Sequence, residues 1–146
     1  MRRWALALVV AAVVLVAIYL AQRSRGAAPS NDPFAETTTV LLDGSPYVVY
    51  VADTPAKQTR GYMNATSYDP RGVGAVGMLF LFGRNSTWCF WMHDTYLPLR
   101  IVWVSGTEVT QEVLAQPLND TPICGYGDKA LELEPTIPPP AVVVVK

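Results

Sequence analysis

The chain has 146 residues, of which 51% are hydrophobic, and its 11 basic and 12 acidic side chains leave a formal net charge of −1. A near-neutral chain lacks the basic surface that nucleic-acid binding requires, so we expect no nucleic-acid partner. With one histidine and two cysteines that form no C-x-x-C, the sequence assembles no metal site, and we expect neither a metal nor a cofactor.

The N-terminal residues predict a membrane anchor. Residues 4–22 carry no charge and would span about 28 Å as a helix, close to the hydrocarbon thickness of a bilayer. This run is longer than the apolar centre of a secretory signal, and Arg23 and Arg25 follow it in place of a good small-residue cleavage site. We therefore expect residues 1–25 to form a single transmembrane helix that is retained, with a cleaved signal peptide as the alternative.

Beyond the anchor, residues 26–36 predict a flexible linker and residues 37–146 predict one β-rich domain outside the cytoplasm. Four arginines lie before residue 26, whereas seven basic against twelve acidic residues give the remainder a charge of −5. Arginines flank the apolar run on both sides, so the orientation is taken from the domain, whose two cysteines permit one disulfide outside the cytosol. Three of the four asparagines begin N-x-S/T sequons and are candidates for N-glycosylation: Asn64, Asn85 and Asn119.

The domain begins with a predicted β-hairpin and a helix. Thr37–Leu42 and Tyr47–Ala52 are β-branched and apolar runs, and the turn-forming residues between them predict a hairpin. Thr54–Met63 is the predicted helix, because Thr54 or Asp53 can cap its start and proline suits the first helical position.

The rest of the domain is predicted to be β-structure. Its runs are apolar or alternate between apolar and polar residues, and turn-forming residues separate them. With the hairpin they give roughly eight short strands, which predicts a mainly β domain, either a small barrel or a sandwich, with one short helix. The predicted strands are Val76–Phe82, Thr87–His93, Leu99–Val104, Glu108–Leu114, Lys129–Glu134 and Ala141–Val145.

Five segments carry a resemblance to a known family. In chain order they read V-A-D-T-P, R-G-Y-M from Arg60, G-M-L-F from Gly77, F-W-M-H-D-T-Y-L-P-L-R-I from Phe90, and L-E-L from Leu131. In this order and spacing they resemble domain of unknown function 192, a bacterial and archaeal family, over about residues 50–134. The resemblance implies a compact, mostly β, barrel-like fold with one short helix, and it implies no particular reaction.

The chain departs from the family pattern at three polar positions. The usual motif reads F-W-M-K-N-T with P-L-D after it, whereas this sequence has His93, Asp94 and Arg100 at the Lys, Asn and final Asp positions. If these residues bind something in the family, the altered charge implies a different ligand here, or none.

The two cysteines allow two outcomes. Cys124 lies in a turn-rich stretch that could reach over a strand to Cys89. A disulfide between them would close a loop of about 35 residues and stabilise the fold by about 3–4 kcal/mol. The alternative is a pair of buried free thiols.

An aromatic-rich stretch is the best candidate for a binding site. Strand alternation places Trp88 and Phe90 on one face and Trp91 on the other, so both faces cannot pack on one core. An exposed aromatic face beside charged side chains would bind a sugar ring, a peptide or a partner protein. The candidate ligand- or partner-binding residues are Arg60, Trp91, His93, Asp94, Thr95, Arg100 and Glu132.

These features predict a membrane-anchored binding or accessory module without catalytic residues, such as a subunit of a membrane or cell-surface assembly. One alternative is an enzyme acting on envelope carbohydrate, which would require Glu132, Asp94 or His93 to converge in a cleft. Glu132 and Glu134 share one face of a predicted strand at a spacing that could suit a pair of glycosidase carboxylates. The other alternative is a structural subunit that pairs with a second chain through the β-prone residues Ala141–Val145.

Overall fold

A computed structural model describes residues 30–146 of the chain. The predicted membrane anchor and the first residues of the predicted linker lie outside these residues. Within the described part, no helix is long and apolar enough to cross a membrane. Residues Asn31–Lys146 make up a structural unit of their own.

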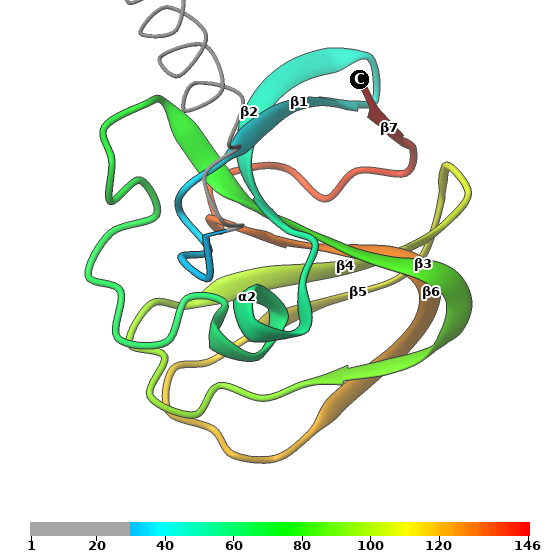
Figure 1. Cartoon of the computed structure of the whole chain (residues 1–146). Helices are drawn as coiled ribbons and strands as arrows, with labels where there is room; N and C mark the ends of the chain where they lie inside the picture. The colour runs from blue at the N-terminus through cyan, green and yellow to red at the C-terminus, as the bar shows by residue number, and fades with distance from the viewer. Residues whose placement is uncertain (1–29) are drawn as a thin grey trace, which may run out of the picture. The chain divides into compact units, whose positions relative to one another are not determined.

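Seven strands form one sheet in the order β5-β4-β6-β3-β2-β1-β7 (Figure 1). Only the β2–β3 pair is parallel; the other neighbouring strands of this sheet run antiparallel. The long strands β3 and β6 curve side by side across the domain. The strands are β1 (Thr37–Leu42), β2 (Ser45–Ala52), β3 (Ala75–Phe90), β4 (Leu99–Ser105), β5 (Glu108–Ala115), β6 (Ile123–Leu133) and β7 (Val143–Val145).

The two edges of the sheet meet at the C-terminal segment. Strand β7 pairs with β1, while Val142 bridges to Glu108 at the start of β5. The amide of Val109 donates to the carbonyl of Ala141 at 3.0 Å, which adds a backbone bond at this junction. The sheet therefore closes on itself here, as in a barrel, and the C-terminal strand pairs inside its own chain. The predicted mainly β fold with one short helix is confirmed, with seven strands in one sheet.

Helix α2 (Pro55–Arg60) is shorter than the predicted Thr54–Met63. Its start follows the sequence, because the Thr54 hydroxyl accepts from the Lys57 amide at 3.3 Å and proline occupies the first helical position. It ends at Gly61, whose φ of 46° and ψ of −130° cannot continue a helix and favour glycine. The predicted last turn was wrong because this backbone conformation redirects the chain.

Two predicted strands, Val76–Phe82 and Thr87–His93, are one continuous strand in the structure. Strand β3 changes its register against β6 between Leu81 and Ser86, and this irregularity lets the strand bend without ending. The strand ends at Phe90, three residues before the predicted boundary. The side chains after Phe90 therefore need not alternate between the two faces of the sheet.

The central strands send alternate side chains into two apolar clusters, one on each face of the sheet. On β3, Met78 and Phe80 belong to the first cluster and Leu79 to the second. On β6, Leu131 and Leu133 belong to the second cluster. The side chain between these two leucines, a glutamate, therefore faces the first cluster.

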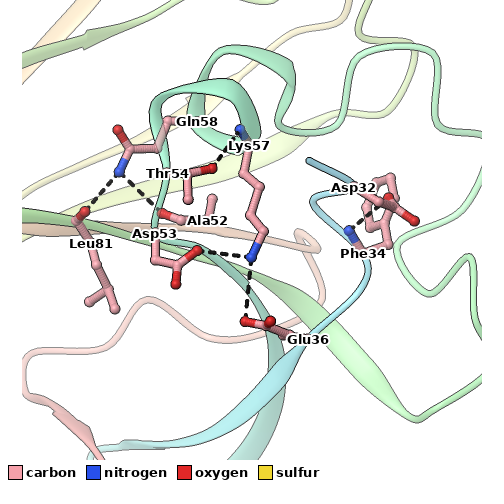
Figure 2. A network of polar contacts seen from close by, with 9 residues as sticks. All are labelled: Asp32, Phe34, Glu36, Ala52, Asp53, Thr54, Lys57, Gln58 and Leu81. Carbon is pink, nitrogen blue, oxygen red and sulfur yellow. Dashed lines mark hydrogen bonds and ion pairs between the residues drawn. The ribbon is translucent and has the colours of Figure 1, made fainter. Parts of the chain in front are cut away.

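Buried polar contacts fix helix α2 against the sheet (Figure 2). The Lys57 side chain is only 2% exposed, and its Nζ lies 2.9 Å from Asp53 Oδ1 and 3.3 Å from Glu36 Oε2. The hydrogen bond to Asp53 raises the pKa of Lys57 and lowers that of Asp53. The Gln58 side-chain amide donates to carbonyls of β2 and β3 at 3.2 and 2.7 Å. These bonds hold the end of α2 over the face that carries the glutamate.

Candidate functional site

A cavity of about 330 Å³ lies where the end of α2 meets β3 and β6. Its volume falls in the range of small-molecule binding sites, and such sites combine apolar walls with a few placed polar groups. Five aromatic side chains from β3 and the turn after it make up much of the wall: Phe80, Phe82, Trp88, Phe90 and Trp91.

Glu132 is the buried acidic group of this cavity. It stands on the central strand β6, where Met78 of β3 and Ile101 of β4 are its neighbours across the sheet. The residue is 5% exposed, and its Oε2 has no hydrogen-bond partner among the described residues. Burial raises the pKa of this carboxyl to about 8. At neutral pH and with no ligand bound, Glu132 is therefore mostly a neutral carboxylic acid.

The chain leaving α2 passes close to this carboxyl group. A Cβ atom at Gly61 would lie 3.4 Å from Glu132 Oε2 and 3.4 Å from Phe80 Cζ. The next residue, Tyr62, is fully buried and donates its hydroxyl to the Tyr68 carbonyl at 2.8 Å. Burial, followed by the nearby Glu132 carboxyl, raises the pKa of Tyr62 far above its usual range. Glycine thus keeps open the space beside the acid, and the tyrosine closes one side of it.

The aromatic wall is held by ring contacts and by one indole hydrogen bond. Phe82 stacks on Trp88 with 4.2 Å between the ring centroids, and Phe80 meets Phe90 edge-on at 5.0 Å. Trp88 Nε1 donates to the Gly127 carbonyl at 3.0 Å. The walls are therefore set by packing within the domain.

Trp91 lines the same cavity as Trp88 and Phe90, and it is 51% exposed. Trp88 and Phe90 pack against the first apolar cluster, whereas Trp91 is the exposed ring of the three. Strand β3 ends at Phe90, so the alternation that the sequence predicted no longer applies at the next residue. Half of this side chain is left in contact with solvent beside the cavity.

Four of the predicted binding residues line the cavity, namely Arg60, Trp91, Thr95 and Glu132. The Arg60 side chain is 53% exposed and reaches to 3.9 Å from Asp32 Oδ1. These residues come from α2, the turn after β3, and β6, so tertiary folding is what brings them together.

His93 and Asp94 lie in the turn after β3 and do not line the cavity. His93 Nδ1 lies 2.9 Å from Asp120 Oδ1, and its Nε2 lies 3.5 Å from Asp94 Oδ2. The hydrogen bond to Asp120 and then the charge of Asp94 raise the pKa of His93. The contact between His93 and Asp120 therefore links the turn after β3 to the loop before β6.

Arg100 lies on the opposite face of the sheet from Glu132. It pairs with Glu112 of β5 and donates to the carbonyls of Ile137 at 3.0 Å and Pro135 at 3.2 Å. It therefore ties the segment after β6 to β4 and β5, and it does not line the cavity.

Cys89 and Cys124 form a disulfide, which decides between the two outcomes that the sequence left open. The sequence placed Cys124 in a loop that reaches over a strand, whereas in the structure it stands on strand β6 directly opposite Cys89 of β3. Cys89 also lines the cavity. The disulfide thus joins the last residues of β3 to the first residues of β6, beside the aromatic wall.

Asn64, Asn85 and Asn119 all lie on the surface, where their side chains are exposed. Glycosylation at these three positions stays a prediction.

Sequence reasoning missed several residues that shape the cavity. Gln58, Gly61, Tyr62 and Phe80 all line it, although none was a candidate. A signal for three of them was present, since Gly61 and Tyr62 fall in the R-G-Y-M segment and Phe80 in the G-M-L-F segment. Those segments are far apart in sequence, and a periodicity argument treats each one separately.

The cavity offers one carboxyl group and few other reactive groups. Glu132 is the one carboxylate among the described residues that line it. Glycoside hydrolysis uses a pair of carboxyl groups flanking the scissile bond, and Glu134 hydrogen-bonds Thr136 beyond the end of β6. Residues 30–146 also contain no cluster of histidine, cysteine or acidic side chains able to hold a metal ion. This arrangement suits binding better than two-carboxylate hydrolysis.

The domain is thus a small, mainly β protein with a sheet that closes on itself and an aromatic cavity with a buried acid. The chain belongs to the DUF192 family, described as "Uncharacterized ACR", which matches residues 38–137. The family resemblance seen in the sequence is confirmed.

Two crystal structures are similar to this chain. One is a protein of unknown function from Novosphingobium aromaticivorans DSM 12444, with 28% identity and a TM-score of 0.61, over 82% of this chain and 94% of that chain. The other is a Sinorhizobium meliloti 1021 protein described provisionally as a transcription regulator, with 23% identity and a TM-score of 0.65, over 75% of this chain and 94% of that chain. The second likeness establishes the fold alone. A comparison with curated proteins finds no match.

All five segments that carry the family resemblance contribute to the cavity wall. Pro55 comes from the first segment, Arg60 from the second, Phe80 from the third, Phe90 from the fourth and Glu132 from the last. The three positions at which this chain departs from the family pattern do not line it. The segments shared with the family pattern therefore supply most of the residues that line the cavity, and the rest come from between them: Gln58, Thr59, Phe82, Trp88 and Cys89.

Proposed function

We propose that the protein is a membrane-anchored binding module outside the cytoplasm, which takes a small ligand or a ligand side chain into the cavity beside Glu132. The observation that carries the proposal is the unpartnered Oε2 of this fully buried carboxyl group inside an aromatic cavity. Leaving a buried polar atom unpaired costs about 1–3 kcal/mol, so its retention calls for a role. A bound ligand that hydrogen-bonds this oxygen supplies one.

Binding is favoured over catalysis by what surrounds the acid. His93, the one histidine of the sequence, and Asp94 lie off the cavity. General acid–base work on a substrate in the cavity would fall to Glu132 alone. The aromatic rings, by contrast, supply the large contact area on which binding sites for small ligands depend.

The placement outside the cytoplasm has three supports. Residues 4–22 form an uncharged run long enough to span a bilayer. The Cys89–Cys124 disulfide is of a kind that persists in oxidising compartments. The three sequon asparagines are all exposed, as glycosylation would require.

The binding proposal is tested with the full chain in a non-ionic detergent, carrying ¹³C-methyl methionine, against a library of small fragments. Met63 lines the cavity, whereas Met92 is fully buried in the core and does not line it. We expect some fragments to shift the Met63 signal and leave the Met92 signal in place. Trp91→Ala should weaken those hits severalfold because it removes cavity wall, whereas Tyr96→Ala removes an aromatic ring of similar exposure outside the cavity and should not. A library that leaves Met63 unmoved would contradict the proposal.

The location is tested by adding protease to intact cells. We expect loss of the C-terminal domain, while a cytoplasmic marker protein survives. Survival of the domain until the cells are lysed would refute a position outside the cytoplasm.

A further inference from the structure

The hydrogen-bond donors around the cavity are mostly committed to the protein itself. Trp88 Nε1 donates to a carbonyl of β6 at 3.0 Å, and the Tyr62 hydroxyl donates to the Tyr68 carbonyl at 2.8 Å. The Gln58 amide donates to two backbone carbonyls, as Figure 2 shows, and the Thr95 hydroxyl donates to a carbonyl in its own turn at 3.1 Å. A sugar, with hydroxyl groups around its whole ring, would leave acceptors unpaired in such a cavity.

The buried acid, in contrast, lacks a donor and a counter-charge. Oε2 of Glu132 has no partner in the described chain, and its pKa is raised by burial with no basic side chain lowering it. Arg60, the one basic residue that lines the cavity within the described chain, is half-exposed and lies 3.9 Å from Asp32. Solvent and this aspartate screen its charge from the interior. The site therefore favours a ligand head group with a hydrogen-bond donor and a positive charge.

An ammonium group meets both requirements. It carries three donors and no acceptor, and it supplies the opposite charge that allows a buried carboxyl to ionise. The ring of Phe80 flanks the same space as Glu132 Oε2, since both lie 3.4 Å from the Cβ position of Gly61. Aromatic rings attract cations and also accept an apolar ligand body.

We propose that the cavity binds the protonated amino group of a ligand with an apolar body, with the ammonium hydrogen-bonded to Glu132 and the body packed along Phe80, Phe90 and Trp91. This inference rests on the proposed function of the cavity as a ligand site, and it names the ligand class. The amine can belong to a free small molecule or to a lysine side chain of a partner protein, and the chemistry is the same for both.

Proton balance gives the proposal a signature. Near neutral pH the unliganded site holds a protonated Glu132, so binding an ammonium ion ionises the carboxyl and releases one proton to solvent. The affinity should therefore rise up to tenfold per pH unit below about pH 8 and level off above it. It should fall again where the amine itself loses its proton, near pH 10 for an alkylamine.

The experiment uses the full chain in a non-ionic detergent and measures the dissociation constants of three probes by titration of the Met63 methyl signal. Benzylamine tests the free amine, benzyl alcohol is its neutral counterpart of similar shape, and Nα-acetyl-lysine N-methylamide tests the lysine side chain. We expect benzylamine to bind more than tenfold more tightly at pH 8.5 than at pH 6.5, while benzyl alcohol binds independently of pH. Calorimetry in buffers of different ionisation heat should detect the released proton. Tighter binding of benzylamine would indicate a free small amine as the ligand, and tighter binding of the lysine derivative would indicate a lysine side chain of a partner protein.

Glu132→Gln should weaken amine binding at pH 8.5 by tenfold or more, remove its pH dependence and leave benzyl alcohol binding in place. Glu134→Gln, two residues along and outside the cavity, is the matched control and should change nothing. If benzyl alcohol binds as tightly as benzylamine at pH 8.5, the amine inference is overturned while the proposed function stands. If no probe moves the Met63 signal although fragments of the library do, the amine inference is overturned and the proposed function stands; if the library also leaves Met63 unmoved, both are overturned. The pH dependence and proton release of the unaltered protein decide the matter even if the Glu132→Gln substitution impairs folding.

Discussion

Replacing Glu132 by glutamine should make the stability of the domain less sensitive to pH. In the folded protein the pKa of this carboxyl is about 8, against 4.5 for a free glutamate. Between these values the folded state holds a proton that the unfolded state has lost. The contribution of Glu132 to stability is therefore fully present below about pH 4.5 and is lost as the pH rises through 8.

The magnitude follows from the two pKa values. Each pH unit between them removes about 1.4 kcal/mol of the free energy of unfolding, which amounts to about 3 kcal/mol at pH 7 and about 5 kcal/mol at pH 9. Glu132→Gln removes this dependence because the amide does not ionise. The amide is also left partly unpaired, at a cost of about 1–3 kcal/mol that does not vary with pH.

The assay is urea unfolding of the full chain in a non-ionic detergent at several values between pH 5 and pH 9. The diagnostic quantity is the difference in free energy of unfolding between Glu132→Gln and the unaltered protein. We expect the stability of the variant relative to the unaltered protein to increase by about 1.4 kcal/mol for each pH unit up to about pH 8. Glu134→Gln, at a half-buried position outside the cavity, should not produce this slope. Parallel curves for the Glu132 variant and the unaltered protein would refute the buried, unpaired state of Glu132.

Three further predictions concern the scaffold around the site. Asp43→Ala should lower the free energy of unfolding by about 1–3 kcal/mol, because the Asp43 carboxylate accepts hydrogen bonds of 2.9–3.2 Å from the backbone amides of the segment before β7. Asp43→Asn keeps one acceptor oxygen and tolerates the positive φ at this position, so it should cost less free energy of unfolding in the same urea titration. Lys57→Met should lower the free energy of unfolding by about 1–3 kcal/mol by leaving Asp53 without its donor, and an unchanged thermal midpoint would contradict this role. Replacing Cys89 and Cys124 together by serine should cost about 3–4 kcal/mol through the lost 35-residue loop constraint, and reductant should then no longer affect the thermal midpoint.

Local sequence signals located most of the strands. Thr37–Leu42 is strand β1 with the predicted bounds, since a β-branched run followed by a turn needs no distant partner to be recognised. The helix start was equally local, because the Thr54 cap and the following proline act within one turn. Errors arose where the chain bends. Gly61 ends α2 early, and the irregularity after Leu81 joins two predicted strands into β3.

The candidate site was less accessible from the sequence, for a physical reason. Alternation on β6 predicts that Glu132 and the adjacent leucines face opposite sides, but it does not say what covers either side. The burial of this carboxyl depends on α2, on Gly61 and on the rings of β3, which come from other parts of the chain. Trp91, in the turn just after β3, lines the same cavity.

By itself the sequence determined the mainly β character, the start of the helix and the family, because propensity, capping and motif order are properties of short segments. It also carried the expectation of a membrane anchor, which stays a prediction. Tertiary structure alone decided that the sheet closes through β7 and β5, that Cys89 meets Cys124, and that one acid is enclosed by aromatic rings. Each of these depends on contacts between segments distant in the chain, and those contacts fix the register and burial that local preferences leave undetermined.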